Sequence, residues 1–285
     1  MADTATVKSH KPQFLTALPA DAPVYFPRVF AMLSHRGLVR HANQDACAAL
    51  PEHGAFVVCD GVGGAAAGEV ASHLAAESFL NSLSHRPKLT SASAAQNAAD
   101  PYPEDHPHTR LQRAVCSANH AVFQRAQRSR TMRGMATTLV AALWEAASNT
   151  PTIWLAHVGD SRCYLFRGGA LQLLTQDHSL VEEQVRAGQL SRQQADCSPI
   201  RNIITRAVGS CPSVEPDISA HTTQPGDILL LASDGLTREL DDSHIAEILT
   251  STAGPTLDPA CQALIDAAND RGGRDNITVL LIACP

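Results

Sequence analysis

The feature that most constrains the fold is a repeated pattern in which a short apolar run meets an aspartate. In three places a run of strand length leads into the acid, as Phe56–Cys59 leads into Asp60, and in the fourth place the acid precedes the run Ile277–Ile282. Apolar runs of this length, bounded by Gly, Asp and Ser, are typical of buried strands, so we expect sheets with covered faces. The four aspartates are Asp60, Asp160, Asp234 and Asp275.

Helical periodicity accompanies these runs in three segments. Apolar residues recur on one face of Gly68–Leu83 and of Leu111–Arg128. A third helix is expected to begin at Asp258-Pro259 and to end before Gly272-Gly273. Helices and strands are grouped rather than strictly alternating, which favours a layered α+β domain over a doubly wound parallel sheet.

The chain has 285 residues, of which 44% are hydrophobic, and this is enough for one large domain with a buried core. We expect that domain to span residues 28–285. Residues 1–27 mix Pro, Ala, Thr and charged residues without periodicity, so they are expected to form a flexible tail. Residues 84–109 are rich in Ser, Ala, Pro and His and are expected to form a surface insertion.

Composition argues against several classes of protein. The net charge of -6 offers no general basic surface for a phosphate backbone, so nucleic acid is not an expected partner. The 8 cysteines form no CxxC pair, which argues against a zinc knuckle or a disulfide framework. No run approaches the roughly 18 apolar residues of a membrane span, and Met1–Phe26 lacks the apolar core of a secretory signal. We therefore expect a cytoplasmic protein without membrane insertion, and a monomer.

The aspartates would form a metal site if the strand ends converge. A single Asp-Gly after a strand is usually only a turn, but several gathered carboxylates repel one another unless cations are bound. Oxygen-rich ligation without paired Cys or His suits Mg²⁺ or Mn²⁺. Two such ions roughly 3.5 to 4 Å apart can bridge a water molecule, lower its pKa and direct it at a phosphorus atom. The pattern therefore indicates phosphoester hydrolysis without a nucleophilic side chain.

Two further residues fit this chemistry. Gly61 permits close backbone approach, so its carbonyl can face a metal. Arg40 is the best candidate for a phosphate clamp, because a guanidinium binds phosphate oxygens in pairs. A lone arginine on a polar stretch is more often a solvated surface group. A nucleotide loop is not indicated, since the sequence has no GxGxxG register and no Gly-Lys-Ser/Thr.

Six ordered segments resemble the motifs of a known family, the metal-dependent (PPM, type 2C) protein serine/threonine phosphatases of the bacterial type. The likeness runs from about Phe30 to Ile282. It implies a β-sandwich of two antiparallel sheets flanked by helices on both outer faces, a four-layer αββα fold with the metals at one end. The segments are Gly37–Asp45, Val58–Gly64 with Gly68–Ser72, Met135–Thr138, His157–Arg162, Leu231–Leu236 and Gly273–Ile277.

The resemblance also implies a set of metal ligands. Asp60 would bridge two ions, and Gly61 would bind one of them through its carbonyl. Asp234 and Asp275 would hold the other ion. Asp160 would help to hold a third, weaker ion.

The same resemblance implies roles in substrate binding and hydrolysis. Arg40 matches the arginine that binds the substrate phosphate, and Asp45 matches an acidic residue that acts through metal-bound water. Residues 178–202, with Ser179 and Ser191 as expected helix caps, take the place of the family's variable flap beside the substrate cleft.

The chain departs from the family pattern near these residues. Gln44 stands where many relatives have a glutamate, which removes one charge close to the metals. Val62 and Ala65 replace histidines found in other members, so the general acid for the leaving group is not identified. His41 and His35 are candidates, although an ordinary surface histidine is the better interpretation of each.

These observations predict a protein serine/threonine phosphatase that uses two Mn²⁺ or Mg²⁺ ions per active site to hydrolyse phosphoserine and phosphothreonine. Its partners would be phosphorylated proteins, including Ser/Thr kinases and their substrates, by resemblance alone. Two alternatives stay open: a metal-dependent phosphoesterase acting on nucleotides or small phosphates, and an inactive phosphatase-like binding module. Retention of all four aspartates disfavours the inactive module.

Overall fold

The structure is a computed structural model, and it describes residues 29–63, 65–84, 102–145 and 151–284. The expected tail, residues 1–27, lies outside the described residues, as does most of the expected insertion at 84–109. The second helix begins at Pro107, inside the range expected to form that insertion. In the described parts of the chain, no helix is long and apolar enough to cross a membrane.

Two antiparallel sheets form the centre of the fold, as expected. The first sheet contains, in spatial order, β1 (Phe30–His35), β11 (Ile277–Ala283), β10 (Ile228–Ala232), β7 (Arg162–Arg167) and β8 (Ala170–Leu173). The second contains β2 (Asp45–Leu50), β3 (Ala55–Val62), β5 (Leu139–Glu145), β6 (Thr152–Val158) and β9 (Asp217–Thr222), with the short β4 (Ala136–Thr137) paired to β3.

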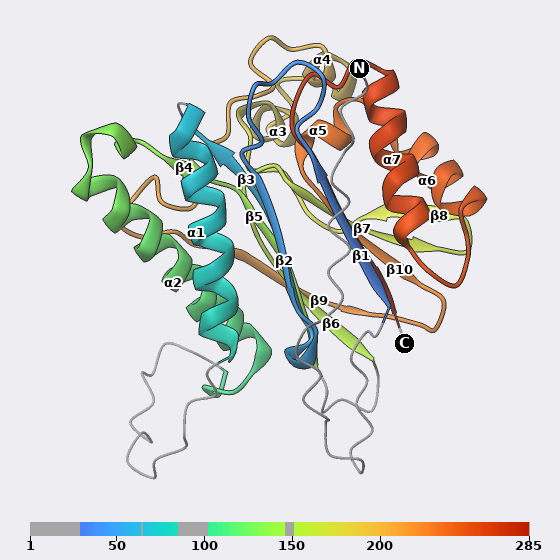
Figure 1. The fold of residues 1–285 in the computed structure, drawn as a ribbon, viewed down its shortest axis with the longest axis horizontal. Coiled ribbons are helices and arrows are strands. Elements are labelled where there is room, and N and C mark those ends of the chain that lie inside the picture. Colours follow the sequence, from blue (N-terminus) through green and yellow to red (C-terminus); the bar gives the residue numbers. More distant parts are fainter. Residues whose placement is uncertain (1–28, 64, 85–101, 146–150, 285) are drawn as a thin grey trace.

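Helices cover the outer face of each sheet, which gives the four-layer arrangement that the resemblance implied (Figure 1). The second sheet is covered by α1 (Ala65–Ser84) and α2 (Pro107–Arg128), and the first by α5 (Asp234–Thr237), α6 (Asp242–Ser251) and α7 (Asp258–Asp270). Near the upper end in Figure 1 lie α3 (Leu180–Arg186) and α4 (Arg192–Asp196). Single 3₁₀ turns occur at η1 (Pro51–His53) and η2 (Arg130–Met132).

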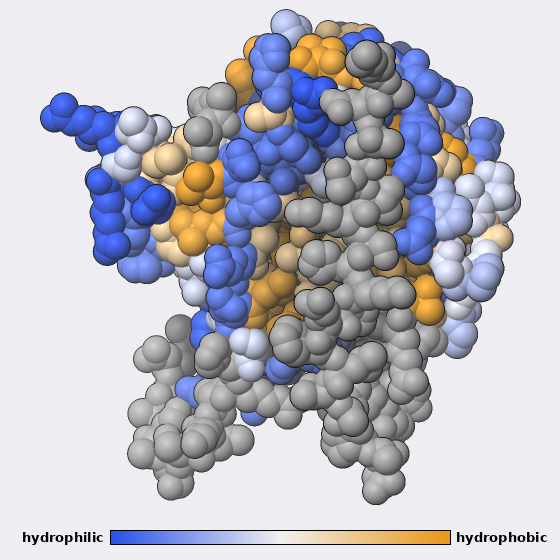
Figure 2. Space-filling view, viewed as in Figure 1, coloured by the Kyte–Doolittle hydropathy of each residue, from blue (hydrophilic) through white to orange (hydrophobic). Residues whose placement is uncertain are grey.

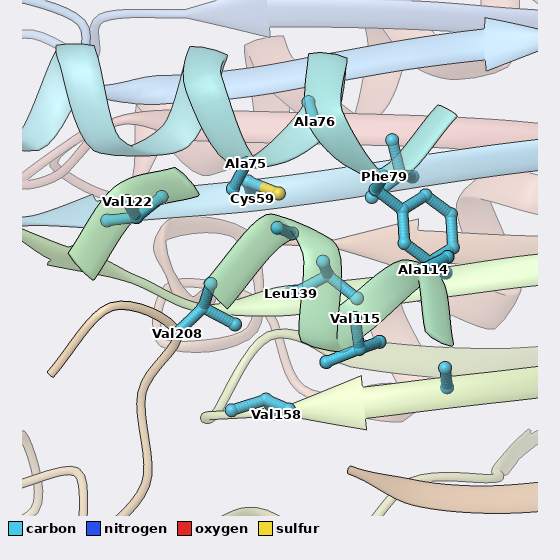
Figure 3. Packing of buried hydrophobic residues seen from close by; sticks show 14 of the residues in the cluster. Cys59, Ala75, Ala76, Phe79, Ala114, Val115, Val122, Leu139, Val158 and Val208 are labelled. Atoms are coloured by element: carbon cyan, nitrogen blue, oxygen red, sulfur yellow. The ribbon is translucent and has the colours of Figure 1, made fainter. Parts of the chain in front are cut away.

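The alternation of side chains along β3 shows how the layers are held together. Phe56 and Val58 face the opposite sheet, whereas Val57 and Cys59 face α1 and α2. Successive side chains on a strand point to opposite faces, so one apolar run can serve two cores. Figure 3 shows the helix-facing core, in which Phe79 of α1 lies close to Ala114 of α2.

The outer surface of the helical layers is mainly hydrophilic in the view of Figure 2. This agrees with helices that bury one apolar face. On α2 the fully buried residues recur at three- and four-residue spacing: Leu111, Ala114, Val115, Ala118 and Val122.

Candidate metal centre and phosphate-binding loop

The predicted aspartates meet at one end of the sandwich, the upper end in Figure 1, where both sheets and their connections contribute. Asp60 lies in β3, Asp160 in the β6–β7 connection, Asp234 directly after β10, and Asp275 shortly before β11. Burial raises the pKa of Asp60, and repulsion from Asp45, Asp234, Asp160 and Asp275 raises it further. The structure therefore brings together all the acidic residues that the sequence singled out.

The backbone of Asp60 is fixed by two threonines. Its amide donates to Thr138 Oγ1 at 2.9 Å, and its carbonyl accepts from the Thr138 amide at 2.8 Å and from Thr137 Oγ1 at 2.8 Å. Thr138 is held in turn by a 2.6 Å hydrogen bond with Ser161 Oγ. These bonds place the segment Met135–Thr138 beside Asp60, although more than seventy residues separate the two in sequence.

Gly61 lies where no side chain fits. A Cβ at this position would come within 2.1 Å of the Gly68 carbonyl oxygen and within 2.6 Å of that of Gln44. The amide of Gly61 also donates to the Gln44 carbonyl at 3.1 Å. Close approach of three backbone segments therefore requires glycine here, independently of any metal.

Asp45 connects the two sheets. It pairs with Asp60 across β2 and β3, and its Oδ2 accepts from Ser233 Oγ at 2.7 Å, directly after β10, and from Thr278 Oγ1 at 2.6 Å, in β11. Burial raises the pKa of Asp45 to about 7, although the two hydroxyl hydrogen bonds lower it. Asp45 is therefore a buried acid that exchanges its proton near neutral pH, and a nearby cation would favour its ionised form.

The loop that carries Arg40 is held by Asn276, a residue that sequence reasoning named only as part of a motif. Asn276 Nδ2 donates to the carbonyls of Arg36 and Ala42, both at 2.9 Å, and its Oδ1 accepts from the Gln44 amide at 2.8 Å. The side chain of Asn276 thus holds both ends of the loop next to Asp275.

Arg40 itself contacts a predicted metal ligand. Its Nη2 donates to Asp275 Oδ2 at 2.7 Å, while 51% of its side chain remains exposed. Within the described residues this bond uses one of the five N–H groups of a guanidinium, so the remaining donors can meet an oxygen pair from solution. The placement suits the predicted phosphate clamp.

A second arginine, which sequence reasoning missed, lies inside the carboxylate cluster. Arg238 Nη2 is 3.2 Å from Asp160 Oδ2 and also contacts Asp234 Oδ2, and Nη1 is 3.9 Å from Asp275 Oδ2. Its side chain is only 23% exposed. The available signal was its spacing, because a residue four positions after Asp234 lies on the same side of a helical turn.

The donor chemistry of the cluster fits hard divalent cations. Asp45 Oδ1 and Asp234 Oδ1 are buried without a hydrogen-bond partner among the described residues. Burial raises the pKa of Asp160 to about 7, and it also raises the pKa of Asp234, with Arg238 opposing the shift in both. Such oxygen donors are those that Mg²⁺ and Mn²⁺ take.

The side chains are not arranged around an ion, however. In the described ranges, no group of three or more His, Cys, Asp or Glu residues is positioned to hold a metal. Guanidinium groups contact three of the carboxylates instead: Arg238 contacts Asp160 and Asp234, and Arg40 contacts Asp275. Ion binding at Asp275 Oδ2 therefore requires the Arg40 contact to loosen, whereas Asp234 Oδ1 has no hydrogen-bond partner among the described residues and does not contact Arg238.

The segment expected to form a flap adjoins a cavity of about 680 Å³ next to this cluster. Asp160 and Asp234 line one side of the cavity, and Val181 of α3 and Ala195 of α4 line another. The expected helix caps are present: Ser179 accepts from the Glu182 amide, and Ser191 forms a capping box with Gln194.

Neither candidate for the general acid is identified by the geometry. His35 Nδ1 accepts from the Gly37 amide at 3.0 Å, so this ring nitrogen serves the turn. Val62, at the end of β3, is 41% exposed and has no group that could donate a proton.

Comparison with known proteins agrees with this architecture. The family model for protein phosphatase 2C matches residues 35–277. The serine/threonine phosphatase stp of Listeria innocua is 36% identical over 250 residues, which is 87% of this chain and 92% of that protein. The Mycobacterium tuberculosis serine/threonine phosphatase PstP/Ppp superposes with a TM-score of 0.74 at 33% identity, covering 89% of this chain and 97% of the other.

A further solved structure contains metal. The catalytic domain of the serine threonine protein phosphatase PstP, in complex with two manganese ions, has a TM-score of 0.71 and 33% identity over 89% of this chain and 96% of that one. The family model covers most of the chain, the relatives match over nearly their whole lengths, and the sandwich carries the acids at the expected end. The chain belongs to the protein phosphatase 2C family.

Proposed function

We propose that this protein is a metal-dependent protein serine/threonine phosphatase whose centre binds two Mn²⁺ or Mg²⁺ ions. The observation that carries the proposal is the convergence of Asp60, Asp234 and Asp275 from two sheets beside an exposed arginine. Family membership supports it, as do relatives named serine/threonine phosphatase and a structural neighbour with two manganese ions.

Each residue would have a distinct role. Asp60, with the carbonyl of Gly61, would hold one ion, and Asp234 and Asp275 would hold the other. When bound, such ions supply an activated water molecule and stabilise negative charge on the phosphoryl group. Arg40 would exchange its bond with Asp275 for the phosphate oxygens and so orient the phosphorus atom. Asp45, fixed by Ser233 and Thr278, would orient water at the ions.

Phosphorylated protein segments are the proposed substrates. The cavity of about 680 Å³ beside the aspartates is lined mainly by charged and hydroxyl side chains, which suit a polar substrate. Phosphorylated proteins, including Ser/Thr kinases and their targets, are therefore the proposed partners, and a monomer is the proposed form.

The test is phosphate release from phosphoserine and phosphothreonine peptides by purified protein, with and without chelator, in Mn²⁺, Mg²⁺ or Zn²⁺. We expect turnover in Mn²⁺ or Mg²⁺ that chelator abolishes. A nucleotide and a small aryl phosphate in the same panel distinguish a general phosphoesterase. Absence of turnover under all these conditions, with the protein folded, would favour the inactive binding module.

A further inference from the structure

The position of Arg238 has a consequence for the number of metal ions. One nitrogen of its guanidinium, Nη2, contacts a carboxylate oxygen of Asp160 and one of Asp234 at the same time. Asp160 is the acid that the resemblance assigned to a third, weaker ion, and Asp234 is one of the two acids assigned to the second ion. A hard cation bridging them would sit roughly 2.0 to 2.6 Å from each oxygen, in the space that Nη2 takes.

The backbone keeps Arg238 at this place. Its amide donates to the Asp234 carbonyl at 2.8 Å, and the Leu240 amide donates to the Leu236 carbonyl at 2.9 Å. Leu236 and Leu240 are both buried in the core under α5. The arginine stem therefore starts from an anchored turn directly beside Asp234, and its charged end has a short path to both acids.

Charge makes an exchange with a metal ion unfavourable. A guanidinium does not lose its proton in proteins, so it remains a fixed positive charge. A divalent ion between the same two carboxylates would have to displace this group and would be repelled by it at close range. Asp60 makes no described contact with Arg238, and Arg238 contacts Asp234 through Oδ2, which leaves Asp234 Oδ1 without a hydrogen-bond partner among the described residues. The two ions at Asp60 and at Asp234 Oδ1 therefore do not face this direct competition.

We propose that the positively charged guanidinium of Arg238 takes the place of a third metal ion between Asp160 and Asp234. The chain then binds two divalent ions, and Asp160 is a partner of Arg238 rather than a metal ligand. The inference rests on the proposed two-ion centre and specifies which of its acids hold metal.

The test is the number of Mn²⁺ ions bound per chain, measured by equilibrium dialysis with elemental analysis at millimolar free Mn²⁺. Wild type is expected to bind two ions and Arg238→Ala three. Asp160→Asn is expected to leave the wild-type number unchanged, but to return the Arg238→Ala protein from three ions to two. The dependence on Asp160 therefore appears only when the arginine is absent.

Two further variants act as controls. Arg271→Ala removes an arginine that lines the same cavity but bonds to the Glu239 carbonyl instead of a carboxylate, so two ions are expected. Arg238→Lys keeps a tethered positive charge, and two ions are again expected. The lysine variant also serves if the alanine variant does not fold, because three ions in Arg238→Lys would contradict the proposal.

Other outcomes are equally informative. Three ions in wild type, reduced to two by Asp160→Asn, would show that Arg238 yields to a metal and would overturn the inference while leaving the phosphatase proposal intact. An Arg238→Ala protein that still binds two ions would overturn it as well. Absence of Mn²⁺ binding in wild type and all variants would overturn the two-ion centre itself. Thermal unfolding with and without Mn²⁺ provides a second readout, with a larger stabilisation expected for Arg238→Ala than for wild type.

Discussion

The two arginines at the carboxylate cluster differ in burial and in the number of acids that each contacts. Among the described residues, Arg40 is 51% exposed and bonds to Asp275 alone, whereas Arg238 is 23% exposed and lies near Asp160, Asp234 and Asp275. An exposed ion pair contributes little to stability, so its partner is easily exchanged. Separating a buried charge from its partner strongly destabilises the folded protein. Arg40 is thus suited to bind an incoming anion, and Arg238 to remain in place.

The largest expected effect comes from removing a proposed metal ligand that no arginine contacts in the described structure. Asp60→Asn should lower Mn²⁺-dependent kcat/KM for a phosphopeptide by roughly a thousandfold or more, since several kcal/mol of charge stabilisation is lost and about 1.4 kcal/mol is tenfold. Asp258→Asn, an exposed aspartate on α7, is the matched control. Undiminished turnover by folded Asp60→Asn would rule out the assigned mechanism.

The next effect separates the two arginines directly. Arg40→Ala should lower kcat/KM by about 10- to 100-fold, because a hydrogen bond to a charged group contributes about 1.5–3 kcal/mol. The number of bound Mn²⁺ ions should not change. A rise in KM alone indicates that Arg40 grips substrate and transition state equally, and a fall in kcat indicates preference for the transition state. If Arg40→Ala instead altered the ion number, the distinction between the two arginines would fail.

A smaller effect should follow from loosening the loop that carries Arg40. Asn276→Ala removes three hydrogen bonds to residues 36–44. We expect KM for a phosphopeptide to rise about fivefold, in line with the roughly 1 kcal/mol of a typical hydrogen bond. Mn²⁺ binding should be retained, since Asn276 supplies no proposed ligand. Steady-state kinetics beside the dialysis measurement would check this, and an unchanged KM would show that Arg40 does not depend on the loop.

The smallest effect concerns Asp45, which bonds to hydroxyl groups rather than to an arginine. Its folded-state pKa of about 7 lies above the unfolded value, so its stabilising contribution is complete below about pH 4 and is lost as pH rises through 7. In chelator, wild type should lose about 1 kcal/mol relative to Asp45→Asn between pH 6 and pH 8. Denaturant unfolding at both pH values measures the difference. A constant difference would show that Asp45 is not protonated in the metal-free protein.

Much of the fold could be predicted because the central strands carry strong apolar signals. The expected run Phe56–Cys59 lies inside β3, and the expected run Ile277–Ile282 is one residue shorter than β11. Three strands were not predicted: the two-residue β4, and the strands β2 and β9, which are the edges of the second sheet. An edge strand pairs on one side only, so alanine-rich or polar sequences such as Asp45–Leu50 and Asp217–Thr222 suffice there.

The helices show the same dependence on signal strength. Long helices with a regular apolar face were expected within a few residues of their ends. The short α6 was missed, although Asp241 caps it and Ile245 and Leu249 form a one-sided apolar pair. Asp258 was expected to be the cap of α7, whereas it is the first helical residue after Leu257.

The sequence indicated which acids would lie close together, but not the groups that surround them. Motif resemblance selected Asp60, Asp160, Asp234 and Asp275, and the structure brings them together. It gave no indication of Arg238, because a side chain that neutralises several remote acids is defined by three-dimensional proximity. A sequence motif therefore indicates candidate metal ligands more readily than the arginines that neutralise them.

Ser233 and Thr278 donate hydrogen bonds to Asp45 across the acidic end of the sandwich. The distance between the two sheets therefore determines the distances between the acids. Immediately beneath lie Val58, Leu231 and Leu280, which fill the layer between the sheets. A void opened there would spread the acids without altering any of them. Inactive variants would consequently arise at these aliphatic positions too, and, unlike losses at the acids themselves, they would regain turnover when more Mn²⁺ is supplied.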